Sequence, residues 1–147
     1  MTKVELMERL PHRDAMLLVG NVEAVEDENG STAVGTTEIC GDEWFLRGHF
    51  PGNPVVPGVI LCEIMAQSVC ALISTQDALP FFSGMKNVKW RKPVRPGDTF
   101  VTRSRITRRV GNFYFVSGIG YVNDEVVMEA DFSFALTESG KEVNNNA

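Results

Sequence analysis

The longest run of apolar residues in the chain lies near its middle, at residues 59–74. It reads VILCEIMAQSVCALIS and contains neither glycine nor proline. The run is too long for a buried strand, so it predicts a helix. Apolar side chains occur on every side of that helix, and we therefore expect other parts of the chain to cover most of its circumference.

Shorter apolar patterns, of the kind that predict strands, occur on both sides of this helix. Before it, residues 16–25 and 31–39 are joined by a charged stretch ending in Asn29-Gly30, which is a strong hairpin signal. After it, residues 78–80 should turn the chain. Further strands are expected at residues 81–90, 99–110, 113–121 and 125–136. This order predicts a single α+β domain in which an antiparallel sheet wraps around the long helix.

Three shorter segments complete the expected organisation. Residues 4–10 have the pattern of a short amphipathic helix that ends before Pro11. Residues 41–47 indicate a helical turn. Aromatic residues around that turn should pack as ordinary core: Trp44, Phe45 and Phe50. From Thr137 onward the polar tail should fray.

The composition is that of a soluble globular protein. Of 147 residues, 44% are hydrophobic and 22% are charged, enough for one domain with a sizeable core. The first residues lack the apolar segment of a signal peptide, and polar residues interrupt the long apolar run, so we expect a cytoplasmic protein that does not enter a membrane. Three cysteines (Cys40, Cys62 and Cys70) without metal-like spacing predict neither a disulfide nor a zinc site.

A constrained loop runs directly into the predicted helix. The loop from Gly48 to Gly58 contains three prolines and three glycines, so His49 projects from a backbone with little freedom. Within the helix, Glu63 is the only other acidic or basic residue between Gly48 and Thr75. Burial of a carboxylate among apolar residues without partners costs several kcal/mol, so the presence of Glu63 in this helix requires an explanation. It either pairs with a structural partner, such as an arginine from a nearby strand, or takes part in acid–base catalysis with His49.

The run G-H-F-P-G-N-P-V-V-P-G-V-I-L-C-E-I-M-A-Q resembles the signature of the (3R)-hydroxyacyl-[acyl-carrier-protein] dehydratases of fatty-acid synthesis, members of the hot-dog fold superfamily. Further segments extend the resemblance over roughly residues 4–137: Leu10-Pro11-His12-Arg13, residues 91–98 and Phe132-Ser133-Phe134-Ala135-Leu136. The chain departs from the family pattern at Asp14-Ala15-Met16 and at Gly20. These departures leave the acyl chain length and the pathway, primary or secondary metabolism, open.

The resemblance implies a catalytic pair and a reaction. His49 and Glu63 match the family's two catalytic residues, and we expect His49 to act as the base and Glu63 as the acid in a dehydration. Backbone N–H groups at Gly58 and Val59, unpaired at a helix start, would stabilise the developing oxyanion. Gln67 either orients the Glu63 carboxyl or a water, or simply fills the helix. His12 is expected to be an ordinary loop residue, because the sequence places no acid–base partner beside it.

Charge is unevenly distributed and bears on the partner. Between Lys86 and Arg109 the local charge is +8, whereas the remainder carries −13. Such a patch favours an anionic macromolecular partner. The candidate docking residues for an acidic acyl carrier protein are Lys86, Lys89, Arg91, Lys92 and Arg95, although any one of them could equally sit on a solvated strand face. Nucleic acid is disfavoured, because the chain carries no nucleic-acid-binding motif and its pI is about 5.0.

Two other functions fit the same residues. A hot-dog thioesterase would use a similar helix and carboxylate to activate water, and a non-catalytic subunit would only bind acyl carrier protein. No metal or diffusible cofactor is expected, because the thioester itself acidifies the proton to be removed. The resemblance further implies a homodimer in which His49 and Glu63 meet from different chains, and a hexamer built of three such dimers.

Overall fold

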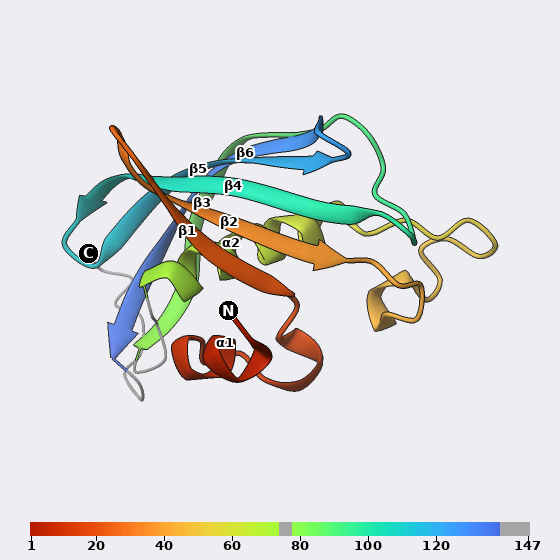
Figure 1. The fold of residues 1–147 in the computed structure, drawn as a ribbon, viewed down its shortest axis with the longest axis horizontal. Coiled ribbons are helices and arrows are strands. Elements are labelled where there is room, and N and C mark those ends of the chain that lie inside the picture. Colours follow the sequence, from red (N-terminus) through yellow and green to blue (C-terminus); the bar gives the residue numbers. More distant parts are fainter. Residues whose placement is uncertain (74–77, 139–147) are drawn as a thin grey trace.

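The computed structural model describes residues 1–73 and 78–138, which form a curved antiparallel sheet around one long helix (Figure 1). The helix α2 spans Gly58–Ile73. The six-stranded sheet has the order β1-β2-β4-β5-β6-β3, and every neighbouring pair is antiparallel. Its strands are β1 Asn21–Asp27, β2 Gly30–Glu38, β3 Ala78–Trp90, β4 Thr99–Val110, β5 Phe113–Val122 and β6 Glu125–Glu138. The predicted α+β organisation is confirmed.

The sheet wraps α2 because that helix has almost no polar side to offer to water. Its residues from Leu61 to Ala71 are buried, apart from the partly exposed Glu63. The helix packs on β1, β2 and β4. Close approach to the sheet needs small residues: a Cβ on Gly35 of β2 would lie 2.1 Å from Ser68 Oγ, and one on Gly118 would lie 2.5 Å from Met65 Sδ. Glycines in the sheet therefore set how closely the helix can lie.

The helix α1, Lys3–Arg9, packs on α2 and covers part of the surface that the sheet leaves open. Thr2 and Glu5 form a capping box at its start, and Leu6 is buried on its inner face. Arg9 donates from Nε to the carbonyl of Ala71 at 2.5 Å and from Nη2 to that of Leu72 at 2.7 Å. These bonds satisfy carbonyls in the last turn of α2 and tie the two helices together. The short amphipathic helix expected at residues 4–10 is confirmed.

Two boundaries predicted from the sequence are wrong. Residues 16–20 are not strand, because Asp14–Met16 is a 3₁₀ turn and β1 begins only at Asn21. Residues 78–80 do not turn the chain, because β3 already begins at Ala78; Pro80 pairs with Leu136 and is tolerated at the edge of the sheet. The fraying expected from Thr137 is not seen at residues 137 and 138, which belong to β6, and the rest of that tail lies outside the described residues.

The helical turn expected at residues 41–47 is the 3₁₀ helix η2, Trp44–Leu46, but its aromatic surroundings are only partly core. Phe45 is buried, whereas Trp44 is 43% exposed and Phe50 is 55% exposed. The Trp44 indole N–H donates to the carbonyl of Ala15, and the Phe50 ring stacks on His49 with centroids 4.3 Å apart. Trp44 and Phe50 thus support neighbouring loops, and their assignment to the core is wrong.

The strand β3 lies at one end of the sheet and exposes large apolar side chains. Residues 81–87 are all exposed. Phe81, Phe82, Met85 and Trp90 have between 42% and 50% of their surface accessible.

Among the described helices, none has the length and apolar character needed to cross a membrane.

The cysteines differ in their surroundings. Cys40 is exposed in the loop after β2, whereas Cys62 and Cys70 are buried in α2, and all three thiols are free. Burial raises the pKa of Cys62 to about 11 and that of Cys70 to about 12. Desolvation, followed by the negative charges of Glu43, Asp42 and Glu38, raises the pKa of Cys40 as well. The helix cysteines therefore behave as small apolar residues, as expected.

Replacing Gly35 with alanine should destabilise the fold, because the new methyl group would collide with Ser68 of α2 and Thr102 of β4. We expect a loss of about 1–3 kcal/mol in the free energy of unfolding, measured by denaturant titration. Gly84→Ala is the matched control, since its Cβ would lie at an ordinary 3.4 Å from Ser133 Oγ. Equal effects of the two substitutions would contradict this account of helix–sheet packing.

Alkylation at pH 8 should separate the three thiols. A raised pKa means less thiolate at a given pH, so buried Cys62 should be roughly a thousandth ionised and Cys70 less still. Iodoacetamide should label native protein at Cys40 alone, and more slowly than a model thiol, while unfolded protein labels at all three positions. Peptide mass spectrometry reads out the sites, with Cys40→Ser as the control. Native labelling of Cys62 or Cys70 as fast as Cys40 would refute the assignment.

Candidate functional site

The loop that carries His49 is held by its own backbone and by the segment before β4. The amide of Val55 donates to the carbonyl of His49 at 2.8 Å, and Phe50 and Asn53 exchange both of their backbone hydrogen bonds. Gly52, with φ of +72°, makes the tight turn between them possible. From outside the loop, Arg95 donates to Asn53 Oδ1 at 2.6 Å. The expectation of a constrained loop is confirmed.

The imidazole of His49 is oriented by the same loop. Its Nδ1 lies 3.0 Å from the carbonyl oxygen of Val55. A carbonyl can only accept a hydrogen bond, so Nδ1 carries the proton in the neutral ring. The lone pair is therefore on Nε2, where a base needs it. The ring itself is half-buried and stacks on Phe50, to which His49 is joined by a cis peptide bond.

The start of α2 lies beside His49. The carbonyl of Pro57 accepts from Ile60 and Leu61, which makes Gly58 and Val59 the first two residues inside the helix. Among the described residues, neither of their N–H groups has a partner, as expected at a helix start. His49, Gly58 and Val59 line an open cavity of about 500 Å³. The helix dipole favours negative charge at this end, so the cavity suits a developing oxyanion.

Trp90 of β3 packs on the same helix start, which the sequence did not reveal. Its indole N–H donates to the carbonyl of Gly58 at 3.1 Å. A Cβ at position 58 would lie 2.6 Å from the indole ring. Glycine is therefore required here by Trp90, in addition to any ligand.

Glu63, one and a half turns further along α2, is held by Gln67. The amide nitrogen of Gln67 donates to Glu63 Oε1 at 3.1 Å and to the carbonyl of Met16 at 2.7 Å. The amide oxygen of Gln67 accepts from the backbone N–H groups of Leu18 at 2.9 Å and Val19 at 3.2 Å. Gln67, which is 1% exposed, therefore contacts the Glu63 carboxyl and also satisfies backbone groups of Met16, Leu18 and Val19. That Gln67 orients the carboxyl during the reaction stays a prediction.

His12 does have an acid–base partner, contrary to the expectation from the sequence. Its Nε2 lies 3.4 Å from Glu63 Oε1, and the side chains are 17% and 22% exposed, respectively. The partner is 51 positions away in the chain, so no local pattern predicts the contact. The only signal for it in the sequence is the Leu10-Pro11-His12-Arg13 segment, which carries part of the family resemblance.

His49 and Glu63 line two different cavities of the described chain. Glu63, His12 and Gln67 border a small cavity of about 30 Å³ together with Pro80 and Phe82 of β3. The cavity at His49 instead includes Trp90, at the other end of that strand. A single chain therefore presents the two halves of the expected catalytic pair at separate places.

The candidate docking residues lie in different settings. Lys86 and Lys89 are exposed on β3. Arg91 pairs with Glu129 at 2.9 Å, and Lys92 pairs with Glu125. Arg91 and Lys92 border the His49 cavity, whereas Arg95 supports the loop through Asn53.

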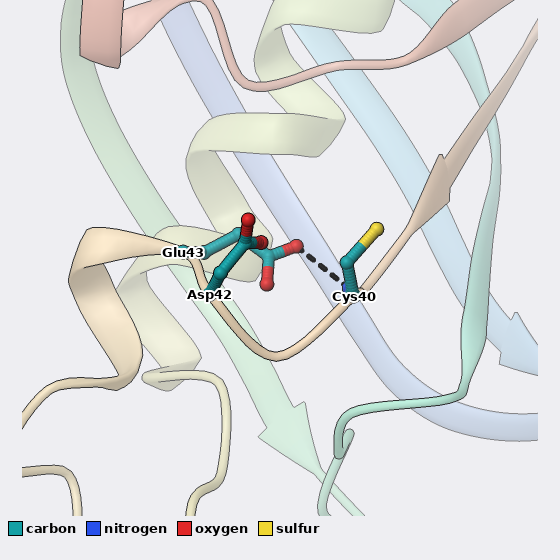
Figure 2. A group of neighbouring side chains, drawn as sticks. All are labelled: Cys40, Asp42 and Glu43. Carbon is teal, nitrogen blue, oxygen red and sulfur yellow. Dashed lines mark hydrogen bonds between the residues drawn. The ribbon is translucent and has the colours of Figure 1, made fainter.

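One cluster outside these cavities has the atoms of a metal site. The ligand atoms of Cys40, Asp42 and Glu43 lie within 4.8 Å of one another (Figure 2). However, both carboxylate oxygens of Glu43 already accept backbone N–H groups, from Cys40 at 2.8 Å and Gly41 at 2.7 Å. Burial alone would raise the pKa of Glu43, but these bonds outweigh it and the pKa is lowered. The carboxylate serves to shape the turn after β2.

Comparison with known proteins places this arrangement in a family. A sequence model described as a FabA-like domain matches residues 10–131. A protein from Fusobacterium nucleatum named 3-hydroxyacyl-[acyl-carrier-protein] dehydratase FabZ is 35% identical over 137 residues, which cover 92% of this chain and 96% of that protein. A protein of the same name from Moorella thermoacetica is 41% identical over 136 residues, covering 88% and 92%, respectively.

Solved structures confirm the hot-dog fold. The dehydratase heterocomplex ApeI:P from Xenorhabdus doucetiae superposes with a TM-score of 0.76 at 18% identity, covering 91% of each chain. A hypothetical thioesterase with coenzyme A from Streptococcus pneumoniae gives a TM-score of 0.57, also at 18% identity, and covers 80% of this chain and 87% of that one. At 18% identity, these structures support the fold and say nothing about function. Taken with the sequence matches over most of the chain, they establish that this protein belongs to the FabA-like family, alongside the FabZ dehydratases.

Proposed function

We propose that this chain is a hydro-lyase that converts (3R)-3-hydroxyacyl thioesters of acyl carrier protein into trans-2-enoyl thioesters. Its family and its relatives named as dehydratases support this assignment. The observation that carries it is the imidazole of His49, fixed by the Val55 carbonyl so that Nε2 keeps the lone pair of a base. It lies beside a helix start whose first two N–H groups have no partner among the described residues.

The proposed reaction divides the work between two side chains and the backbone. His49 Nε2 takes a proton from C2 of the acyl chain, and negative charge develops on the thioester oxygen. The N–H groups of Gly58 and Val59 stabilise that charge. The C3–O bond breaks as the Glu63 carboxyl gives its proton to the departing hydroxyl, so a C2=C3 double bond and water are formed. Proton exchange with solvent then returns His49 and Glu63 to their starting states. No metal or diffusible cofactor enters these steps.

The two halves of the site come together if two copies pair through β3. This strand ends the sheet, and its exposed apolar side chains favour coverage by a partner. Pro80 and Phe82 border the Glu63 cavity, and Trp90 borders the His49 cavity. Antiparallel pairing of two β3 strands about a two-fold axis sets the Pro80 end of one strand opposite the Trp90 end of the other. His49 of one subunit would then face Glu63 of its partner, in a homodimer that further assembles as three dimers.

Acyl carrier protein is the proposed macromolecular partner. Basic residues at the mouth of the His49 cavity, Arg91 and Lys92, together with exposed Lys86 and Lys89 on β3, give this face the positive charge that attracts an acidic carrier. Arg95 adds its positive charge, and it also holds the loop of His49 through its hydrogen bond to Asn53. We expect the protein to act in the cytoplasm.

Removing either acid–base group should abolish most turnover while leaving the fold intact. Glu63→Gln and His49→Asn should each lower kcat by about 10²–10⁴-fold, because general acid–base catalysis contributes that much. Mass spectrometry of a 3-hydroxyacyl carrier-protein substrate would score loss of water, and a thiol assay would score hydrolysis. The control is Asp42→Asn, an exposed change outside both cavities. Full dehydration by Glu63→Gln would remove Glu63 from the mechanism, and thiol release without enoyl product would favour a thioesterase.

Mixing inactive subunits tests whether the site is shared. If His49 and Glu63 act across two chains, a dimer of one His49→Asn chain and one Glu63→Gln chain has one intact site. Random pairing after joint refolding should then restore about a quarter of wild-type activity. Each variant refolded alone is the control. If the mixture remains as inactive as its components although mixed dimers form, as shown by native mass spectrometry, a site shared between chains is ruled out.

A further inference from the structure

We propose that His12 is a positioning residue for the general acid: its neutral imidazole holds a proton on Nε2, directed at Glu63 Oε1, so that the transferable proton of Glu63 is kept on Oε2. This inference rests on the proposed function, because it gives a role beside Glu63 to a residue outside the His49–Glu63 pair. The two oxygens of the Glu63 carboxyl have different surroundings, because both His12 and Gln67 approach Oε1.

The Gln67 amide fixes the first contact. Its oxygen faces two backbone N–H groups, those of Leu18 and Val19, which can only donate. The amide nitrogen must therefore be the atom that faces Glu63, and it too can only donate. Glu63 Oε1 is consequently an acceptor toward Gln67. The donor side of this amide is also anchored by the carbonyl of Met16, so it cannot turn over without losing three backbone partners.

The His12 ring approaches the same oxygen. Its Nε2 lies 3.4 Å from Oε1, while its Nδ1 is buried and has no hydrogen-bond partner among the residues that the structure describes. A proton on Nδ1 would be a buried donor without an acceptor, which proteins avoid more strictly than an unused acceptor. The neutral ring with its proton on Nε2 removes that cost and places the N–H beside Oε1. Both neighbours then offer donors to Oε1, and no described residue forms a hydrogen bond or an ion pair with Oε2.

The loop that presents His12 is fixed by the residue that follows it. Arg13 donates from Nη1 to the carbonyls of Leu10 and His12, both at 2.7 Å, and from Nη2 to the carbonyl of Met7 at 2.8 Å. These bonds fix the backbone at His12 and so the direction from which its ring reaches α2. The Leu10-Pro11-His12-Arg13 segment thus positions His12 beside α2, although it lies outside the loop of His49 and the helix of Glu63.

The two histidines of the chain are accordingly set in opposite tautomers. His49 carries its proton on Nδ1 and presents a lone pair from Nε2, as suits a base. His12 carries its proton on Nε2 and presents a donor, as suits a group that orients a carboxyl. Since the chain contains only these two histidines, a spectrum of its imidazole nitrogens should consist of two patterns.

Long-range ¹H–¹⁵N correlation spectra of the assembled, substrate-free protein in alkaline buffer test the tautomers directly. His12→Gln and His49→Asn assign the two patterns. We expect a protonated Nε2 in His12 and a protonated Nδ1 in His49. A proton on Nδ1 of His12, or rapid exchange between its two tautomers, would overturn the proposal. This result does not depend on turnover, so it stands apart from any failure of the proposed reaction.

Kinetics then test whether the donor matters. His12→Leu should lower kcat by about 10–100-fold with little change in KM, since the orientation of the acid is used only during the reaction. His12→Gln, whose amide can place an N–H near the same point, should recover a large part of that loss. Asp14→Asn is the matched control on the same loop, because asparagine tolerates the positive φ of 54° found there.

Unchanged kcat in His12→Leu would overturn the positioning role, and so would equal losses in the leucine and glutamine variants with unchanged melting temperatures. If the leucine variant fails to fold, the glutamine variant and the nitrogen spectra decide. Neither outcome would touch the assignment of Glu63, which its own substitution tests. Full activity of Glu63→Gln would instead remove Glu63 from the proposed mechanism, on which this inference rests.

Discussion

A helix that is apolar on every side has to be enclosed, and the enclosure of α2 governs the rest of this molecule. The sheet curves over it, α1 covers part of what remains, and glycines on β2 and β5 let the helix come close. Two places on the helix carry the polar groups of the proposed reaction: its first turn, where backbone N–H groups have no helical partner, and the partly exposed side chain of Glu63. The groups of the proposed reaction therefore lie where the sheet and α1 do not cover α2.

Polar groups at those gaps are held by a small number of well-satisfied contacts. Gln67 uses its oxygen and nitrogen for four hydrogen bonds, three of them to the backbone before β1. It therefore couples the path of the N-terminal segment to the position of the Glu63 carboxyl. At the other site, the Val55 carbonyl sets the ring of His49 in the same way. In both cases a group with a fixed role as donor or acceptor determines where a proton can be.

The sequence predicted the strands, the long helix and its loop because their periods and breakers are local properties. His49 and Glu63 were found because they lie in one contiguous motif. The contact of His12 with Glu63 and the hold of Gln67 on residues 16–19 join positions about fifty residues apart, so no local pattern contains them. The same long-range bonds explain why residues 16–20 are not strand. The exposure of Trp44 and Phe50 was not predicted, because the sequence alone does not show which aromatic residues near a loop are covered by other parts of the chain.

In the proposed reaction, an imidazole and a carboxyl group from separate places act on one acyl chain. A crystal structure of the assembled protein with an unreactive 3-hydroxyacyl-pantetheine amide would show whether they meet. We expect His49 Nε2 within about 3–3.5 Å of C2 and a Glu63 oxygen, from the partner subunit, within hydrogen-bond distance of the 3-hydroxyl. A bound analogue that contacts only one of the two groups, with the other out of reach in every subunit, would contradict it.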